Sequence, residues 1–329
     1  MRDALRDAGL RSEIFAEEIA QRLLGEARPA EQLAGSVEAG DVVLYHLSIG
    51  AASALLFAAL PCRRVIVYHN ITPAEYYRVV SPRVAYWLER GRRDLARLAP
   101  AVELGVAGSA YSAAELSAVG CPATMVIPPP VDLERLSPRP AGASGAARLI
   151  SVSRLAPHKR QDQLIRVLAA LRAGGQPAAT LTLPGGGDDT ASYVAGLRRL
   201  ARELDIAEAV ALPGRLGDRE IGDLYASSSV ALSASEHEGF GMPLLEAWAF
   251  DLPVVARAAA AVPETVADAG ILLPDADPLI WAAIIDRLIR DGGLRGLLVA
   301  RGRRRLSAFS DRLFRERMAE LLERLHLRS

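Results

Sequence analysis

The chain contains little cysteine and no long apolar run. Cys62 and Cys121 are its only cysteines, and they do not have the spacing of a metal-binding motif. We interpret both as buried free thiols, which fits a reducing cytoplasm. No apolar segment reaches the roughly 18 residues that a membrane-spanning helix needs, and the chain does not open with a signal-peptide pattern.

Charge of one sign is not in excess either. The 329 residues include 39 Lys+Arg and 39 Asp+Glu, so the formal net charge is zero and nothing favours nucleic acid as a general partner. The content of 50% hydrophobic and 24% charged residues is typical of a soluble globular protein. Lysine is almost absent. Lys159 is the only one, which makes this position more informative than a lysine usually is.

Apolar segments that read as strands alternate with helical segments along almost the whole chain. This pattern predicts an α/β protein with parallel sheets, and the length suggests two domains, each doubly wound and Rossmann-like. Such domains leave a cleft at the carboxyl ends of their strands. The expected strands are Val42–Tyr45, Val65–Tyr68, Val102–Val106, Thr124–Ile127, Leu149–Val152, Thr180–Leu183, Val210–Leu212, Val230–Ser233, Val254–Ala256 and Ile271–Leu273.

A segment rich in proline, glycine and serine divides the two halves. Pro128–Pro130 is followed by Ser137–Gly145, a composition typical of a linker, and we place the boundary near Pro140. The expected domains are therefore residues 1–140 and 141–310. A last helix over 311–327 follows a break at Phe309–Ser310.

The segment from Ser235 to Glu246, SEHEGFGMPLLE, is the most informative part of the sequence. Pro243 suits the first position of a helix, which we expect to run to Ala249. The backbone amides of residues 239–242 would then point out of the helix N-terminus and favour an anion. Glu238 and Glu246 would flank this anion, which suits a ligand that carries both hydroxyls and phosphate.

This segment resembles the E-x7-E motif of family 4 glycosyltransferases, which are retaining enzymes of the GT-B fold that use nucleotide-activated sugars. The resemblance covers most of the chain. Ser151–Asp162 contains Arg154 and Lys159 at the positions of the family's basic pair, and Tyr68–Pro73 contains a matching histidine, His69. Further similar segments are Leu212–Leu216, Val262–Gly270 and Ala308–Ser310.

The resemblance implies a role for each matching residue. Arg154 and Lys159 would bind the donor diphosphate, and charge-assisted hydrogen bonds from them would stabilise the leaving group without a metal ion or another cofactor. Glu238 would hold a sugar hydroxyl, Glu246 the ribose hydroxyls, and His69 would face the donor sugar. The other expected donor-binding residues are Gly239, Phe240, Gly241, Met242, Leu216 and Gly185, and we assign His46, Ser48 and Asn70 to the acceptor side.

Some other candidates have simpler interpretations. Asp275–Asp277 spells D-x-D, which other glycosyltransferases use to bind a metal ion, but Asp277 precedes Pro278 and is expected to cap a helix. Asp189 is likewise expected to be a helix cap. His158 and His237 lie inside motifs, but either could equally face solvent, and neither is given a role.

We therefore expect a bacterial, GT-B-like retaining hexosyltransferase that makes cell-envelope polysaccharide or glycolipid. Residues 1–140 would bind the acceptor, with the helix over 311–329 crossing back, and residues 141–310 would bind the donor. Alternatives are a nucleotide-sugar epimerase, a sugar phosphorylase, against which the lack of a pyridoxal-type site argues, and a non-catalytic nucleotide-sugar-binding protein. Donor sugar, base, acceptor and linkage stay open.

Residues 76–100 are rich in arginine and carry interleaved aromatic side chains. Basic helices with aromatic residues can lie on anionic bilayers, so a lipid-linked acceptor and peripheral contact with the inner face of the membrane are expected. The alternative is a solvated helix face whose aromatic residues pack inward.

The N-terminus lacks an element that the family leads us to expect. A domain of this kind should open with a buried strand and a glycine-rich loop, yet Met1 leads into a short amphipathic helix that ends near Gly9. Ser12–Ala16 resembles the second strand. Since the first strand is central in this fold, we expect a missing upstream segment and a 329-residue form of low stability and activity.

Overall fold

The structure, a computed structural model, describes residues 1–137, 139, 145–274 and 277–327. The chain divides into two compact units. The first unit comprises Met1–Ala74, Ala85–Pro129 and Asp311–Ser329, and the second comprises Glu75–Val84 and Pro130–Ser310. The division at Pro129 comes earlier than the expected boundary, Pro140, which itself lies outside the described residues. The reason is that Leu136 is 1% exposed and packs in the core of the second unit.

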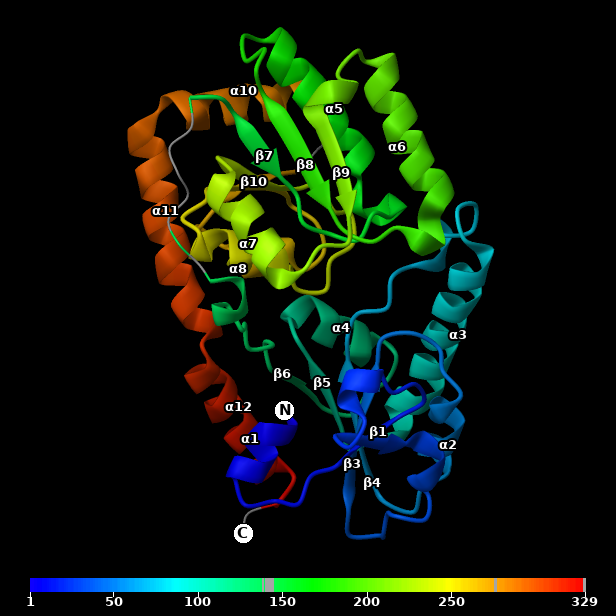
Figure 1. Ribbon diagram of the computed structural model, residues 1–329. Coiled ribbons are helices and arrows are strands. Elements are labelled where there is room, and N and C mark those ends of the chain that lie inside the picture. Colours follow the sequence, from blue (N-terminus) through cyan, green and yellow to red (C-terminus); the bar gives the residue numbers. More distant parts are fainter. Residues whose placement is uncertain (138, 140–144, 275–276, 328–329) are drawn as a thin grey trace. The chain divides into compact units, whose positions relative to one another are not determined.

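The second unit is built on a six-stranded parallel sheet with the order β12-β11-β10-β7-β8-β9. Strands β7, β8, β9 and β10 are labelled in Figure 1. The chain adds β8 and β9 on one side of β7 and then returns to add β10 on the other side. This reversal makes β7 and β10 the neighbours at which a doubly wound sheet places its ligand site. The strands are β7 (Arg148–Ile150), β8 (Thr180–Pro184), β9 (Val210–Gly214), β10 (Val230–Ser233), β11 (Val254–Arg257) and β12 (Ile271–Leu273).

Helices cover both faces of this sheet, because successive strand residues point to opposite faces and both sets are apolar. Leu149 and Leu232 belong to one buried cluster, and their neighbours Ile150 and Ala231 belong to another. The helices are α5 (Gln161–Ala173), α6 (Ala191–Glu203), α7 (Asp218–Ser227), α8 (Met242–Ala249), α9 (Val262–Val266), α10 (Pro278–Arg290) and α11 (Gly292–Leu306).

The first unit contains a four-stranded parallel sheet with the order β3-β4-β5-β6. Helix α12 (Asp311–Arg324) packs on it, with Phe314 and Met318 in the same buried cluster as Val65 and Val106. The other elements are β1 (Ile14–Ala16), β2 (Ala27–Pro29), β3 (Val42–Leu47), β4 (Arg63–Tyr68), β5 (Leu104–Ala107), β6 (Thr124–Val126), α1 (Arg2–Asp7), α2 (Ser53–Ala59), α4 (Ala110–Ala118) and α3 (Pro82–Leu98), which belongs to this unit from Ala85 onward.

The ten strands expected between Val42 and Leu273 are all present, with ends that differ by at most two residues. The N-terminal expectation is met only in part. Ile14–Ala16 forms a strand, but β1 pairs with β2 in a separate two-stranded sheet. Among residues 1–137, β1 and β3 each have a single hydrogen-bonded neighbour strand.

Short 3-10 helices occupy many of the connections. The two that matter for the site are η5 (Glu134–Leu136) and η6 (Pro157–Lys159). The others are η1 (Gln21–Leu23), η2 (Ala30–Gln32), η3 (Ala74–Tyr76), η4 (Ala99–Ala101), η7 (Asp188–Thr190), η8 (Ala207–Ala209) and η9 (Ser307–Phe309).

Candidate active site

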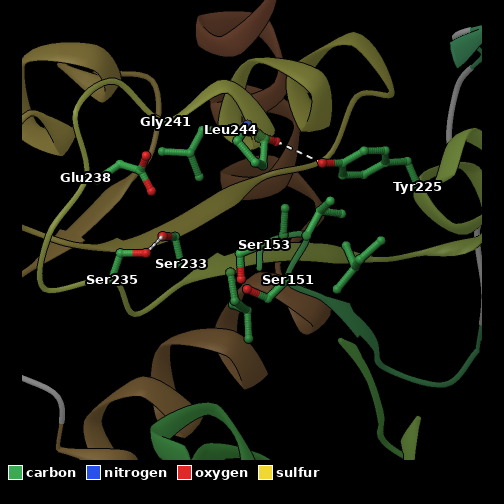
Figure 2. A pocket seen from close by; sticks show the side chains of 13 residues that line it. Ser151, Ser153, Tyr225, Ser233, Ser235, Glu238, Gly241 and Leu244 are labelled. Carbon is green, nitrogen blue, oxygen red and sulfur yellow. Dashed lines mark hydrogen bonds between the residues drawn. The ribbon is translucent and has the colours of Figure 1, made fainter. Parts of the chain in front are cut away.

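A pocket in the second unit lies at the carboxyl ends of β7 and β10, where the strand order reverses. Its open volume is about 360 Å³, with solvent at the mouth included. Figure 2 shows Glu238 and Gly241 on the loop that leads into α8, and serine side chains on the strand ends. The lining residues are Ile150, Ser151, Val152, Ser153, Tyr225, Ala231, Leu232, Ser233, Ser235, Glu238, Gly241, Pro243 and Leu244.

The structure brings two of the predicted site residues together. Lys159 lies at the end of η6, and its Nζ donates to Glu238 Oε2 at 2.5 Å. The two side chains are only 14% and 19% exposed. The ammonium and the carboxylate therefore pair at the edge of the pocket, away from most of the solvent, where their attraction is stronger than on an open surface.

Arg154 follows the pocket residue Ser153, and its guanidinium has two partners. Nη2 donates to Asp189 Oδ2 at 2.5 Å, and the group lies 5.5 Å from the centre of the Tyr77 ring. The expectation that Asp189 caps a helix was wrong, because neither η7 nor α6 has a side-chain cap. Since both members of the ion pair are about half exposed, the pair is weak and a doubly charged phosphate can displace it.

Glu246 is deeply buried and both of its carboxylate oxygens are engaged. Arg135 Nη2 donates to Oε1, and the Tyr225 hydroxyl donates to Oε2 at 3.0 Å. Burial raises the pKa of Glu246, while Arg135 and Tyr225 act in the opposite direction. Sequence reasoning missed Arg135, because it lies in the connector before the second sheet and 111 residues from Glu246, with no motif to mark it.

The loop before α8 is organised as a helix start, although the helix begins one residue earlier than expected, at Met242. Gly241 is the N-cap residue and has a φ of 99°, a left-handed conformation that favours glycine. Phe240 packs edge-on against Phe309, and its carbonyl accepts from the Thr265 hydroxyl at 2.6 Å.

Two other predicted donor-binding residues lie at the ends of neighbouring strands. Gly185 follows β8, and a Cβ at this position would lie 1.9 Å from Ser153 O, so only glycine allows the two loops to approach. Leu216 follows β9 and is half-buried. Of the predicted donor-side residues, Glu238 and Gly241 line the pocket itself, and those outside its lining are Arg154, Lys159, Gly185, Leu216, Gly239, Phe240, Met242 and Glu246.

The predicted residues of the first unit include a histidine pair. His46 Nδ1 lies 2.8 Å from His69 Nε2, and the two rings stack with their centres 5.1 Å apart. Both residues are partly exposed to solvent, but the protein around the rings excludes water from them. This desolvation lowers the pKa of His46 to about 4 and also lowers the pKa of His69. One ring therefore donates and the other accepts, with both neutral at pH 7.

Asn70 is part of a buried network in the first unit. It has a φ of 59°, and its Nδ2 donates to Glu115 Oε2 at 2.6 Å. The Tyr68 hydroxyl donates to the same oxygen at 2.9 Å. This network holds the chain just after His69. Ser48 lies just past β3 and is exposed.

His158 and His237 do not face solvent. They are 5% and 6% exposed, and burial lowers the pKa of His158 to about 2. The His158 ring lies 5.8 Å from that of Tyr76 and 5.7 Å from that of Tyr77. The expectation that these histidines could be solvated was therefore wrong, and for His158 the reason is that Tyr76 and Tyr77 pack against its ring.

Asp277 caps α10 as expected, since its side chain accepts from the Leu279 amide. The other two residues of the D-x-D sequence, 275 and 276, lie outside the described residues. Within the described part of the chain, no group of three or more His, Cys, Asp or Glu side chains is arranged to hold a metal ion.

The basic segment forms α3 and the residues before it. Arg90 and Arg97 pair with Asp94, and Arg92 pairs with Glu115. Of its aromatic residues, Tyr77 is buried and Tyr86 is 52% exposed, so the face is neither fully solvated nor fully apolar. In the described ranges, no helix is long and apolar enough to span a bilayer.

Comparison with known proteins gives a consistent result. D-inositol 3-phosphate glycosyltransferases from Kineococcus radiotolerans and Salinispora arenicola are 32% and 34% identical to this chain over 209 residues. The matches cover 56% of this chain and 48% and 46% of those proteins, so the chain spans about half the length of the curated relatives it matches.

Two solved structures are similar in fold. The HepE protein of Anabaena, solved in complex with UDP and glucose, has a TM-score of 0.72 at 21% identity and covers 98% of this chain and 88% of its own. A glycosyltransferase from Rickettsia africae has a TM-score of 0.75 at 17% identity and covers 100% and 93%. These likenesses establish the GT-B fold. Since the model of the family described as glycosyl transferases group 1 matches residues 135–305, more than half of the chain, this protein belongs to that family.

Proposed function

We propose that the protein is a retaining, metal-independent hexosyltransferase that binds a nucleotide sugar in the second unit and transfers the sugar to an acceptor hydroxyl. The observation that carries this proposal is the Lys159–Glu238 pair at the edge of the pocket, 2.5 Å from Nζ to Oε2. Lys159 supplies a cation and Glu238 an acceptor, which are the groups that a departing diphosphate and a sugar hydroxyl require.

The chemistry follows from the charges. When the glycosidic bond breaks, negative charge develops on the β-phosphate, and Lys159 and Arg154 stabilise it. The diphosphate displaces Asp189 from Arg154 and shares Lys159 with Glu238. Because Lys159 bonds only Oε2 of Glu238, the other carboxylate oxygen can accept from a sugar hydroxyl. Because Glu238 and Glu246 both have binding roles, attack by the acceptor occurs on the face that the diphosphate leaves.

A screen of thermal stability against UDP-, GDP- and ADP-sugars tests donor binding. A donor at a hundred times its dissociation constant stabilises the native state by about 2.7 kcal/mol. Incubation with the binding donor and candidate acceptors then tests transfer, and NMR of the product gives its anomeric configuration. An inverted product refutes the retaining mechanism. An altered free donor indicates an epimerase, and binding without transfer or hydrolysis indicates a non-catalytic protein.

Metal independence has its own test. In the proposed reaction, Arg154 and Lys159 supply the positive charge that a divalent ion supplies in other transferases. Treatment with EDTA should leave the transfer rate unchanged. A loss of rate that Mg²⁺ or Mn²⁺ restores would show that the two cations are insufficient.

We also propose a cytoplasmic protein that contacts the inner face of the membrane and uses a glycan or lipid-linked acceptor, in a bacterial cell-envelope pathway. Exposed Arg93 and Tyr86 on α3 support this part. Co-sedimentation with anionic vesicles at low salt tests it, and absence of binding there removes the membrane contact. Inositol 3-phosphate, named for the curated relatives, is the soluble acceptor to compare with a lipid-linked one.

A further inference from the structure

The connector residue Arg135 is held in place by its neighbours. Leu136 is buried in the core, and a Cβ on Gly222 would lie 2.2 Å from the Leu136 carbonyl oxygen. The backbone of η5 therefore rests directly on α7, at a point where only a glycine leaves room. The backbone of Arg135 is thus fixed at a position from which its side chain reaches Glu246 on α8.

The Arg135 guanidinium bridges two carboxylates. Nη2 donates to Glu246 Oε1 on α8, and Nη1 donates to Asp218 Oδ1 on α7. The side chain of Glu246 is 7% exposed, whereas those of Arg135 and Asp218 are 35% and 56% exposed. Glu246 is therefore the buried end of this bridge, and removal of Arg135 would leave a buried carboxylate without its cation.

The second donor to Glu246 is Tyr225. Its hydroxyl lies 3.0 Å from Glu246 Oε2 and 3.1 Å from the Pro243 carbonyl, so its single proton is shared between two acceptors. Among the described residues, each Glu246 oxygen thus has one hydrogen-bond partner, and a carboxylate oxygen can accept a second bond. The charged and titratable groups that face this carboxylate are Arg135, Tyr225 and Asp218. Burial raises the pKa of Glu246, Asp218 adds to this, and Arg135 and Tyr225 oppose it.

We propose that Arg135 is a positioning residue for the nucleotide donor: it orients the Glu246 carboxylate and keeps it ionised, so that both oxygens accept from the ribose hydroxyls. This rests on the proposed function, in which Glu246 receives the ribose. A protonated Glu246 would turn one of its two acceptors into a donor. Donor affinity is therefore lost as pH falls through the pKa of Glu246, and Arg135 shifts that loss to lower pH because its charge lowers this pKa.

The test compares three variants by calorimetry with UDP, GDP or ADP, whichever binds the wild type best, between pH 6 and pH 8.5. Arg135→Met should weaken binding on the order of tenfold at pH 6, because Glu246 loses the cation that orients it, and should recover part of the affinity at higher pH, since a rise in pH favours the carboxylate. Arg135→Lys should stay closer to the wild type. Arg139→Met is the matched control, because Arg139 is on the same connector and pairs with the exposed Asp223.

A 2′-deoxy nucleotide sharpens the test. Since Arg135 acts through the ribose contact, the difference between wild type and Arg135→Met should shrink with the deoxy ligand, and the KM for the donor should change more than kcat. Arg135→Gln serves if the methionine variant does not fold. Equal affinity and pH profile in wild type and variant overturn the role of Arg135 while the proposed function stands. Failure of the wild type to bind any of the three nucleotides overturns both.

Discussion

Lys159 Nζ lies 2.5 Å from Glu238 Oε2, so the cation proposed for the diphosphate and the carboxylate proposed for the sugar are hydrogen-bond partners. Arg154 is likewise paired with Asp189. Carboxylates thus hold both cations near the pocket. The donor diphosphate must compete with Asp189 for Arg154 and with Glu238 for Lys159. This relationship makes the effects of substitution at each position distinct.

Replacement of Lys159 by alanine should reduce kcat on the order of a hundredfold, because the charge acts mainly on the departing diphosphate. Steady-state kinetics with the identified donor measure this. Arg199→Ala is the control, since Arg199 is a surface cation of the same unit that pairs with Glu203. Full activity in a variant that carries both Lys159→Ala and Glu238→Ala would refute the site.

Replacement of Asp189 by asparagine should strengthen donor binding. The change removes the carboxylate that competes for Arg154, and an exposed pair of this kind contributes up to about 1 kcal/mol, equivalent to a severalfold fall in Kd. Asp188→Asn is the matched control, because Asp188 is 90% exposed and only loosely paired with Arg215. Weaker nucleotide binding by the Asp189 variant in calorimetry would contradict the prediction.

His158 should make the protein less stable in mild acid. Its pKa is about 2 in the folded protein, whereas an unfolded histidine titrates near 6.5, so the folded state holds it neutral and its contribution to stability is lost as pH falls below 6.5. The slope is about 1.4 kcal/mol per pH unit in that window. Urea unfolding at pH 7 and pH 5.5 should show a smaller loss for His158→Asn than for wild type. His326→Asn, at an exposed position, should behave as wild type.

Replacement of Gly185 by alanine should destabilise the second unit by about 2 to 4 kcal/mol, since the new Cβ would overlap Ser153 O at 1.9 Å. The loops after β7 and β8 would move apart, and donor binding would weaken as well. Gly196→Ala on α6 is the opposite case, because its Cβ would meet nothing within 4 Å and helix propensity favours alanine by about 1 kcal/mol. Equal melting temperatures of the two variants would contradict this account.

Much of the fold could be predicted, because parallel strands buried on both faces are continuous apolar segments. Val230–Ser233 and Ile271–Leu273 were predicted at their observed ends for this reason. The start of α8 was predicted within a residue, since the signal from Pro243 is local. The sheet to which Ile14–Ala16 belongs was not predicted, because a short strand does not specify its partner. In the structure this strand pairs with Ala27–Pro29.

Some residues of the candidate site could likewise be predicted from the sequence, and others could not. Arg154, Lys159 and Glu238 lie in short motifs that follow strands, and the sequence alone marked them. The role of Asp189 was misjudged, because a carboxylate near a helix start is equally suited to cap the helix or to pair with a distant cation. Only the packing of the loops after β7 and β8 brought it to Arg154.

The sequence by itself determined the alternation of strands and helices and the chemistry of the groups at the strand ends, since these depend on neighbours along the chain. The tertiary structure decided which of those groups meet. Arg135 reaches Glu246 across 111 residues because Leu136 is buried and Gly222 lets the connector lie on α7. Such a contact depends on the packing of separate elements, and no local pattern records it.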